Sequence, residues 1–449
     1  MDFISILRGI IGLILVIGIA FLFSNNKRKV DWRMVGTGLI IQFVIAIFII
    51  QGEALRSFFF PLGWVKDAVN WLGNAVVAVL GFTIEGSQFV FGKLANSTTS
   101  DSLGFFFAFQ VLPTIIFVST LSALLYYFGI LQLVVKGMAY AMAKLLKTSG
   151  AESLSNTANI FLGQTEAPLL IRPYIAKMTN SELLTIMIGG MATISAALIA
   201  SYSQVLGQAY AEALKIPLQT AQLKFAVELL AASTMAAPAS LVIAKILFPE
   251  TDEPVTKGTV KIKVEKTSSN VIEAAATGAS DGLWLALNVA GMLVAFIALI
   301  AMLNYILLGL GNLFNLNGML QANFGHPLSM QLIFGILLKY LAIGIGVPAK
   351  DAFQFGSLIG TKTVLNEFVA YVDLSNLIKA GQLSEKGITM ATYALCGFAN
   401  FSSIAIQIGG ISPMAPNRKK DIAAFGLKAV LGGALATLMT ATLAGILVQ

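Results

Sequence analysis

The fold of this chain is decided by four stretches: GQTEAP at residues 163–168, GMATIS at 190–195, GTKTVLNEF at 360–368 and GFANFS at 397–402. Each half of the chain therefore carries one glutamate, Glu166 or Glu367, in an interrupted apolar segment, followed by a segment that opens with Gly-x-Ala-x-x-Ser. That spacing by itself is a common helix-packing device. Its recurrence at matching places in both halves predicts an internal repeat.

The composition places these repeats in a membrane. Hydrophobic residues make up 57% of the 449 residues and charged residues only 11%, whereas a soluble domain carries about 25% charged residues. Such a chain cannot cover its surface with polar groups, so most of it faces lipid. Its 41 glycines suit closely packed membrane helices. The predicted fold class is an all-α polytopic membrane protein.

Eight apolar stretches are long enough to be transmembrane helices. They fall at about residues 3–23, 34–51, 103–129, 183–203, 225–248, 283–309, 389–411 and 425–448. Two interrupted stretches, near 154–171 and 331–371, are predicted to be re-entrant helical hairpins. Leu55–Leu94 mixes aromatic residues with sparse charges and is predicted to form interfacial helices. The first stretch exceeds the roughly 7–15 apolar residues of a signal peptide and is interpreted as a retained span.

Basic residues indicate the orientation of these spans, because Lys and Arg are concentrated in cytoplasmic loops. Clusters follow the first and third predicted spans and precede the fourth and last ones. All clusters share one side if both termini lie outside, and the second repeat is then inverted relative to the first. Inverted repeats with discontinuous helices are typical of secondary transporters. Because a glutamate inside a membrane normally faces a cavity or a partner, Glu166 and Glu367 are predicted to share one site.

At these residues the chain resembles the concentrative nucleoside transporters. NIFLGQTEAP at 159–168, TKTVLNEFVAY at 361–371 and CGFANFSS at 396–403 resemble the family's first hairpin, second hairpin and unwound seventh span. The resemblance starts at the family's eight-span core, without the extra N-terminal helices of animal members. It implies a bacterial cytoplasmic (inner) membrane protein that forms a homotrimer and imports nucleosides with sodium, with no other cofactor and no nucleic-acid partner.

The resemblance also implies a division of the chain into a scaffold and a transport domain that moves like an elevator. The expected division is 1–129 scaffold, 130–248 first transport repeat, 249–281 cytoplasmic linker, 282–309 scaffold span and 310–449 second transport repeat.

Residue roles follow from the matching motif positions. By resemblance, Gln164, Thr165 and Glu166 contact the nucleobase, and Glu367 accepts the ribose hydroxyls. The side chains that assist them are Asn400 and Ser403 at the ribose and the apolar Leu198 and Phe398 near the base. The chemistry is consistent, since amides can read the edge of a base and a carboxylate is a strong acceptor for paired hydroxyls.

The coupling ion is expected to bind beside the first hairpin. By resemblance, sodium is held by the side chains of Asn159 and Thr193 and the backbone carbonyls of Leu162 and Ile194. Such oxygens suit a hard cation. The alternative is that Asn159 only caps a helix and that Glu166 or Glu367 carries a proton.

Two alternatives of other classes are a passive channel and an intramembrane enzyme with a carboxylate pair. No nucleophile or metal-ligand set accompanies the two glutamates, and the single histidine, His326, lies in a polar loop segment. Lys362 is the single basic residue inside the matched motifs, which makes a phosphorylated substrate a poor fit. Its side chain is expected to assist the site, to reach the membrane surface or to pair with a carboxylate.

Overall fold

The computed structural model describes residues 3–95, 105–257 and 268–448, and this part of the chain is built from helices. Eight of its helical segments are long and apolar enough to cross a membrane, which confirms the all-α membrane class. They are Ile4–Leu22, Trp32–Ile50, Phe60–Ala95, Phe107–Tyr127, Asn180–Leu214, Leu218–Leu247, Val271–Leu313 and Pro416–Leu447.

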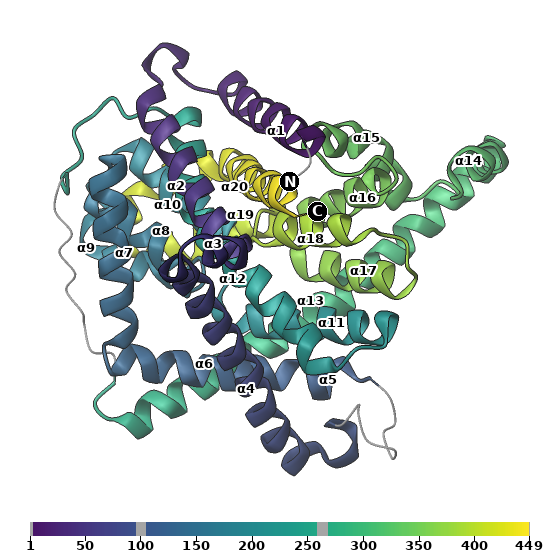
Figure 1. The fold of residues 1–449 in the computed structure, drawn as a ribbon, viewed down its shortest axis with the longest axis horizontal. Coiled ribbons are helices and arrows are strands. Elements are labelled where there is room, and N and C mark those ends of the chain that lie inside the picture. The colour runs from purple at the N-terminus through teal and green to yellow at the C-terminus, as the bar shows by residue number, and fades with distance from the viewer. Residues whose placement is uncertain (1–2, 96–104, 258–267, 449) are drawn as a thin grey trace.

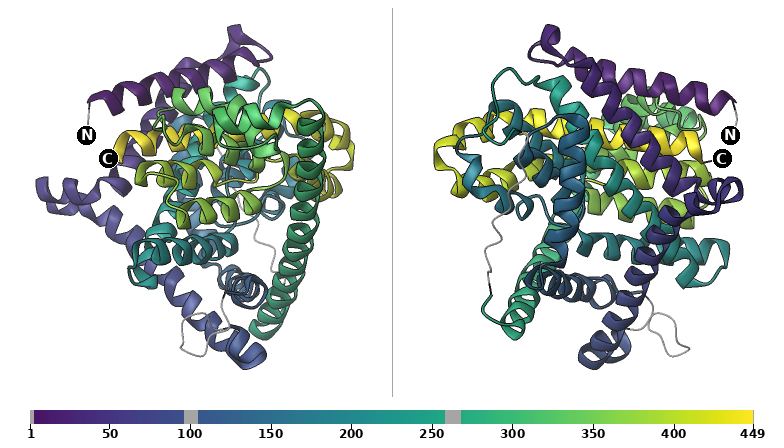
Figure 2. Two further views of the ribbon diagram at one scale, coloured as in Figure 1. Left: turned by 90° about the vertical axis from the view of Figure 1, so that its right-hand side faces the viewer. Right: turned by 60° about the vertical axis from the view of Figure 1, so that its left-hand side comes forward.

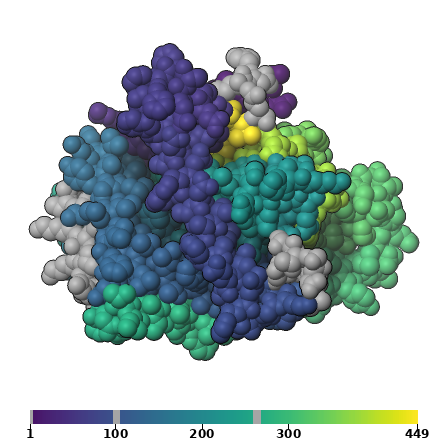
Figure 3. All heavy atoms as spheres, turned by 60° about the horizontal axis from the view of Figure 1, so that its bottom comes forward, coloured from purple at the N-terminus to yellow at the C-terminus, as the bar shows by residue number. Residues whose placement is uncertain are grey.

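This set agrees with the predicted one in number but differs in two members. Residues 60–95, predicted as interfacial, contain the 28-residue helix α4 (Trp64–Phe91), which lies across the outside of α12 (Figure 3). The predicted span 389–411 is divided between two 11-residue helices, and neither reaches spanning length. The predicted span 103–129 begins on residues that lie outside the described part of the chain.

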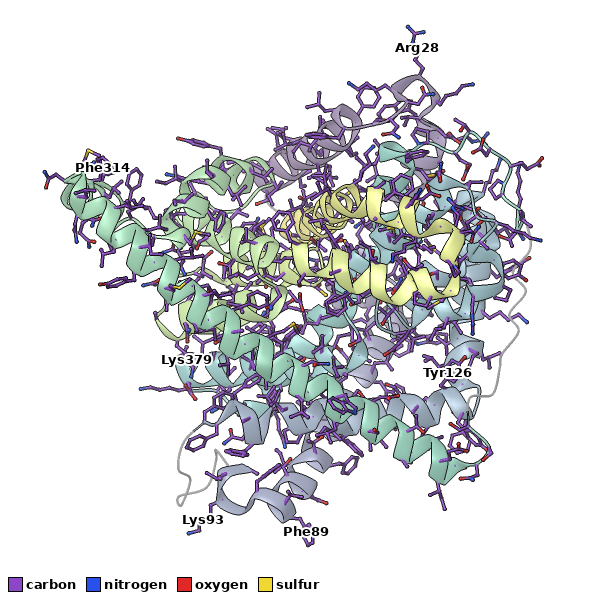
Figure 4. The ribbon with its side chains drawn as sticks, turned by 180° about the vertical axis from the view of Figure 1, so that it is seen from behind. Arg28, Phe89, Lys93, Tyr126, Phe314 and Lys379 are labelled. Atoms are coloured by element: carbon purple, nitrogen blue, oxygen red, sulfur yellow. The ribbon has the colours of Figure 1, made fainter. Side chains whose placement is uncertain are left out.

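The first third of the chain supplies the helices that surround the core. They are α1 (Phe3–Leu22), α2 (Trp32–Ile50), α3 (Gly52–Phe58), α4, α5 (Phe107–Gln110), α6 (Leu112–Tyr127) and α7 (Ile130–Leu146). The 43-residue helix α13 (Val271–Leu313) packs on α6 and runs along one side of the molecule as far as Phe314 (Figures 2 and 4). It begins at Val271, 11 residues before the boundary predicted at 282, and it is followed by α14 (Leu316–Phe324).

The two repeats form the buried centre. The first contains α8 (Gly150–Ala158), α9 (Arg172–Ile175), α10 (Asn180–Ala192), α11 (Ala196–Leu214) and α12 (Leu218–Leu247). The second contains α15 (Met330–Gly344), α16 (Ala352–Val364), α17 (Glu367–Lys379), α18 (Glu385–Leu395), α19 (Phe401–Ile411) and α20 (Lys419–Leu447). The apolar windows of α10–α11 and α20 are each 89% buried, against 6% for α13.

The two hairpins differ in their local structure. In the first, α8 ends at Ala158, and the chain returns through a 3₁₀ turn at Ala167–Ile171 that contains Pro168. Proline suits the first turn of such a helix, where its missing N–H would have no partner in any case. In the second, two 13-residue helices are separated only by Leu365 and Asn366, and Asn366 caps α17 by accepting from the backbone N–H of Val369 (2.9 Å).

Each Gly-x-Ala-x-x-Ser stretch contains an interruption between two helices. We call residues 193–195, between α10 and α11, break 1, and residues 396–400, between α18 and α19, break 2. The backbones meet near them, because a Cβ added to Gly397 would lie 2.8 Å from the carbonyl oxygen of Met191. Glycine is therefore required at position 397 for this close approach. The two termini lie beside each other in all views of the ribbon (Figures 1 and 2).

Candidate functional site

Glu367 is the first residue of α17, and its carboxylate is buried where both repeats meet. One oxygen accepts a hydrogen bond from the Tyr202 hydroxyl of α11 (3.1 Å), and the other accepts from the Asn400 amide of break 2 (3.0 Å). A carboxylate offers about four lone-pair positions. These two bonds orient the group and leave acceptor capacity for hydroxyl donors of a ligand.

Gln164 brings the first hairpin to the same place. Its amide nitrogen donates to the hydroxyl of Ser403 (3.2 Å), and its carbonyl oxygen accepts from Gln407 (3.2 Å). Gln407 also donates to the backbone carbonyl of Met187 in α10 (2.9 Å). The amide of Gln164 is thus oriented by residues of the opposite repeat.

Asn400 connects the two hairpins. It caps α19, since its side-chain oxygen accepts from the backbone N–H of Ser403 (2.9 Å), while its amide nitrogen donates to Glu367. A hydrogen-bonded chain therefore runs from Gln164 through Ser403 and Asn400 to Glu367. Neutral amides, a hydroxyl and one carboxylate are the groups in this chain.

The other predicted substrate residues lie around these hydrogen-bonded groups and differ in how far they are buried. Thr165 packs on α19, since a Cβ on Gly410 would lie 2.4 Å from its methyl group. Leu198 is buried in α11, and Phe398 is a half-buried ring in break 2. Glu166 turns back on its own hairpin and accepts from the backbone N–H of Gly163 (3.1 Å). No hydrogen bond links Glu166 to Glu367 within the described ranges.

Glu166 instead borders a cavity of about 710 Å³ between the first hairpin and helices α6 and α13. The wall includes Leu162 and Ser195 from the repeat and Asp281 from α13. A volume of several hundred Å³ is typical of a small-molecule site. The cavity lies directly beside the predicted sodium ligands and the first hairpin.

Asn159 has an unusual environment for a buried amide. Its side chain is fully buried, and neither its oxygen nor its nitrogen has a hydrogen-bond partner in the described structure. Buried polar groups are nearly always paired, so an unpaired amide indicates an absent partner.

The other predicted sodium ligands lie at or near break 1. Thr193 is buried and donates to the carbonyl of Gly189 (2.9 Å), which leaves its oxygen free to accept. Ala196, the first residue after break 1, donates to the Phe161 carbonyl (3.1 Å), which joins break 1 to the first hairpin. Leu162 and Ile194 are likewise buried.

Two of the roles expected for Lys362, reaching the membrane surface and pairing with a carboxylate, do not agree with the described structure. Lys362 is only 2% exposed, and its ammonium donates to the carbonyl of Ala394 (2.8 Å) and the hydroxyl of Thr437 (3.1 Å). No ion pair joins it to a carboxylate in the part of the chain that the structure describes. The long side chain points inward because α16 is packed against α18 at this place.

Two residues that donate hydrogen bonds to the ends of this hydrogen-bonded chain were not predicted from the sequence. Tyr202 lies one turn after Leu198 in α11, and Gln407 is an amide in the otherwise apolar stretch IAIQIGG of α19. The amide in an apolar helix is a recognisable signal, because it needs a partner in a membrane. Tyr202 carries no such signal, since buried tyrosines are common.

Family models cover most of the chain. "Na+ dependent nucleoside transporter C-terminus" matches residues 228–445, and "Na+ dependent nucleoside transporter N-terminus" matches residues 11–94. A third model, described as "Nucleoside recognition", matches residues 108–209.

Relatives align along nearly the whole chain. An "Uncharacterized transporter" of Haemophilus influenzae is 44% identical over 99% of this chain and 98% of its own length. The mouse "Sodium/nucleoside cotransporter 1" is 37% identical over 97% of this chain, which spans 63% of that protein.

Solved structures show the same architecture. The chain is similar to CNTnw in an inward-facing substrate-bound state, with 40% identity, a TM-score of 0.83 and coverage of 99% of this chain and 98% of that one. A doubly substituted CNTnw in an outward-facing state gives 39% identity, a TM-score of 0.85 and the same coverage. The predicted re-entrant hairpins and inverted repeat agree with this likeness.

Proposed function

The chain belongs to the family of sodium-dependent, concentrative nucleoside transporters, which are transporters and not enzymes, and from this premise we propose that it imports nucleosides by sodium symport. The observation that carries the proposal is the hydrogen-bonded chain between the hairpins. It offers amide and hydroxyl groups at Gln164 and Ser403, and a carboxylate at Glu367. A nucleoside presents a base edge and ribose hydroxyls, which are the complementary donors and acceptors.

The proposed substrate contacts follow that complementarity. Gln164, Thr165 and Glu166 of the first hairpin face the nucleobase, with Leu198 and Phe398 as apolar walls. Glu367 accepts from the ribose hydroxyls, aided by Asn400 and Ser403. Hydrogen bonds to a charged acceptor contribute about 1.5–3 kcal/mol each, so the ribose end supplies much of the affinity.

The proposed sodium position lies at break 1, and the orphaned amide of Asn159 supports it. Sodium would be held by the side-chain oxygens of Asn159 and Thr193 and the carbonyls of Leu162 and Ile194. The interrupted helix leaves backbone carbonyls free for such a role. Asn159 and Leu162 lie shortly before Gln164 in the first hairpin, so a cation bound to them would order the base-binding part of that hairpin.

The helix arrangement supports an elevator-like motion. Helices α6 and α13 pack on each other, and the apolar window of α13 is only 6% buried, against 89% for those of α10–α11 and α20 in the repeats. The proposed transport domain contains both hairpins and the helices that follow them, including α10–α12 and α18–α20. Its displacement relative to α6 and α13 would carry the site across the membrane.

The proposed assembly is a homotrimer in the bacterial inner membrane, with both termini outside. Much of α13 is exposed and apolar, including Trp284 (66% exposed) and Val294 (74% exposed), so it suits contact with lipid or with a second copy. The adjacent termini are consistent with a shared side of the membrane (Figure 1).

The test is uptake of radiolabelled nucleosides into proteoliposomes. Inward sodium gradients should drive saturable accumulation above equilibrium, and choline in place of sodium should abolish it. Equilibration without accumulation would indicate a channel. Accumulation in choline under an imposed proton gradient, collapsed by a protonophore, would replace sodium with a proton carried by a carboxylate.

A further inference from the structure

Lys362 is a buried cation that none of the proposed roles uses. It lies in the last turn of α16, five residues before Glu367, and its ammonium is enclosed by α18 and α20. A buried ammonium without an adjacent counter-ion is costly and needs hydrogen-bond acceptors. Its presence in the second hairpin therefore calls for a specific function.

The ammonium completes the hydrogen bonding of an interrupted helix. The last four carbonyls of an α-helix have no intrahelical donor. In α18 all four have other donors: the Tyr371 hydroxyl reaches Thr392 (2.9 Å), the Cys396 N–H reaches Tyr393 (3.2 Å), Lys362 reaches Ala394 (2.8 Å), and the Gly397 N–H reaches Leu395 (2.8 Å). Lys362 is the one charged donor of this set. It holds α18 at the residue from which break 2 departs.

Break 2 in turn positions the carboxylate. Asn400, at the end of break 2, donates to Glu367 and caps α19 at the same time. A shift in the path of residues 396–400 would move the Asn400 amide away from Glu367.

From this arrangement we propose that Lys362 is a positioning residue for ribose recognition, a cation built into the second repeat that fixes break 2 and so keeps the Asn400 amide on Glu367. The proposal rests on the proposed nucleoside function. It assigns Lys362 no contact with substrate, because its ammonium donates to Ala394 and Thr437 and to none of the proposed substrate residues.

The test compares Lys362→Met with Lys362→Arg in purified, full-length protein. Calorimetry measures the affinity for a ribonucleoside and for the corresponding 2′,3′-dideoxynucleoside at fixed sodium concentration. With one charge-assisted interaction lost, Lys362→Met should weaken ribonucleoside binding by about tenfold or more and dideoxynucleoside binding by less than about threefold. Lys362→Arg should retain more of the ribonucleoside affinity, because it keeps the positive charge.

A second measurement separates positioning from packing. In a Glu367→Gln background, Lys362→Met should weaken ribonucleoside binding by less than about threefold, because the group that it positions is already changed. Equal losses for both ligands, or equal losses with and without Glu367, would overturn the proposal. Should Lys362→Met fail to fold, Thr437→Val removes one acceptor of the ammonium and is judged by the same ligand ratio.

Nucleoside binding by the wild-type protein shows whether a negative result concerns the role of Lys362 or the proposed transport function. Wild-type protein that binds no nucleoside contradicts the transport function itself. Wild-type protein that discriminates between the two ligands, together with a Lys362→Met variant that keeps the same ratio, contradicts only the role of Lys362.

Discussion

Break 1 and break 2 have the same Gly-x-Ala-x-x-Ser sequence pattern, yet the free backbone carbonyls of the helix that precedes each break are hydrogen-bonded differently. In break 2, protein donors reach each of the last four carbonyls of α18, and Lys362 is one of them. In break 1, the Thr193 hydroxyl reaches the carbonyl of Gly189, whereas no donor from the described chain reaches those of Met191 or Ala192. The unpaired side chain of Asn159 belongs to the same repeat.

This difference indicates that the two repeats have different functions. In break 2 the protein itself supplies the donors for the free carbonyls, so the role we propose for break 2 is to hold the Asn400 amide against Glu367. Break 1 retains free acceptors, which is the condition for binding a cation from solution. Aligned position by position, Thr193 of break 1 corresponds to Asn400 of break 2. One is the proposed ion ligand and the other the partner of Glu367.

The largest expected effect comes from removing the charge of Glu367, the carboxylate that break 2 holds through Asn400. Glu367→Gln should abolish uptake, because one acceptor becomes a donor that faces ribose hydroxyls, and two lost bonds of about 1.5–3 kcal/mol each correspond to a loss of roughly a hundredfold or more. The loss should be smaller for 2′,3′-dideoxynucleosides. Asp373→Asn, six residues later in α17, is the matched control and should retain uptake. Near-normal uptake by Glu367→Gln would remove this residue from the site.

The next effect concerns break 1. Asn159→Ala should raise the sodium concentration for half-maximal uptake by about tenfold or more, since one of the roughly five or six oxygen ligands is lost. Thr193→Ser keeps the hydroxyl oxygen and should leave sodium dependence within about twofold of the wild type. Sodium titration of uptake measures both variants. An unchanged sodium requirement in Asn159→Ala would mean that break 1 is not where the ion binds.

A smaller effect should follow from loosening the carboxylate without changing its charge. Tyr202→Phe removes one of the two donors to Glu367 and should weaken ribonucleoside binding by about threefold to tenfold, as expected for a hydrogen bond worth about 1 kcal/mol. Tyr371→Phe is the control, because its hydroxyl serves α18 and not Glu367. Tyr371→Phe should lower thermal stability more than ribose discrimination. Calorimetry and thermal unfolding measure the two properties. A Tyr371→Phe variant that lost ribose discrimination but kept its thermal stability would contradict the assignment of Tyr371 to the support of α18.

Much of this architecture could be predicted from the sequence because membrane constraints are strong. Composition and apolar length predicted the all-α class, and the repeated glutamate motifs together with the distribution of basic residues predicted the inverted repeat. The path of the chain in hairpin 1 could not be predicted in detail. GQTEAP could be recognised as an interruption, but the short helix α8 and the 3₁₀ return depend on packing as well as on Pro168.

The site shows a similar limit. The sequence motifs predicted Gln164, Glu367, Asn400 and Ser403, which the structure joins in one hydrogen-bonded chain. Lys362 was harder to interpret, because its sequence neighbours do not reveal the carbonyl of Ala394, 32 residues away, that accepts from it. Partners from distant segments arise from the crossing of the two repeats, which local sequence patterns do not specify.

The smallest expected effect tests the apolar wall of break 2. In the aligned motifs Phe398 corresponds to Met191, but Met191 is fully buried whereas the ring of Phe398 is half-buried. Phe398→Ala should weaken binding of all nucleosides by a similar factor of about two to ten, because an aromatic face contacts every base and contributes about 0.5–1.5 kcal/mol. Phe401→Ala, three residues further and 49% exposed, is the matched control and should have less effect. Calorimetry with a purine and a pyrimidine nucleoside measures the two factors. If Phe398→Ala exchanged purine for pyrimidine preference, Phe398 would read base identity, and break 2 would serve the base as well as the ribose.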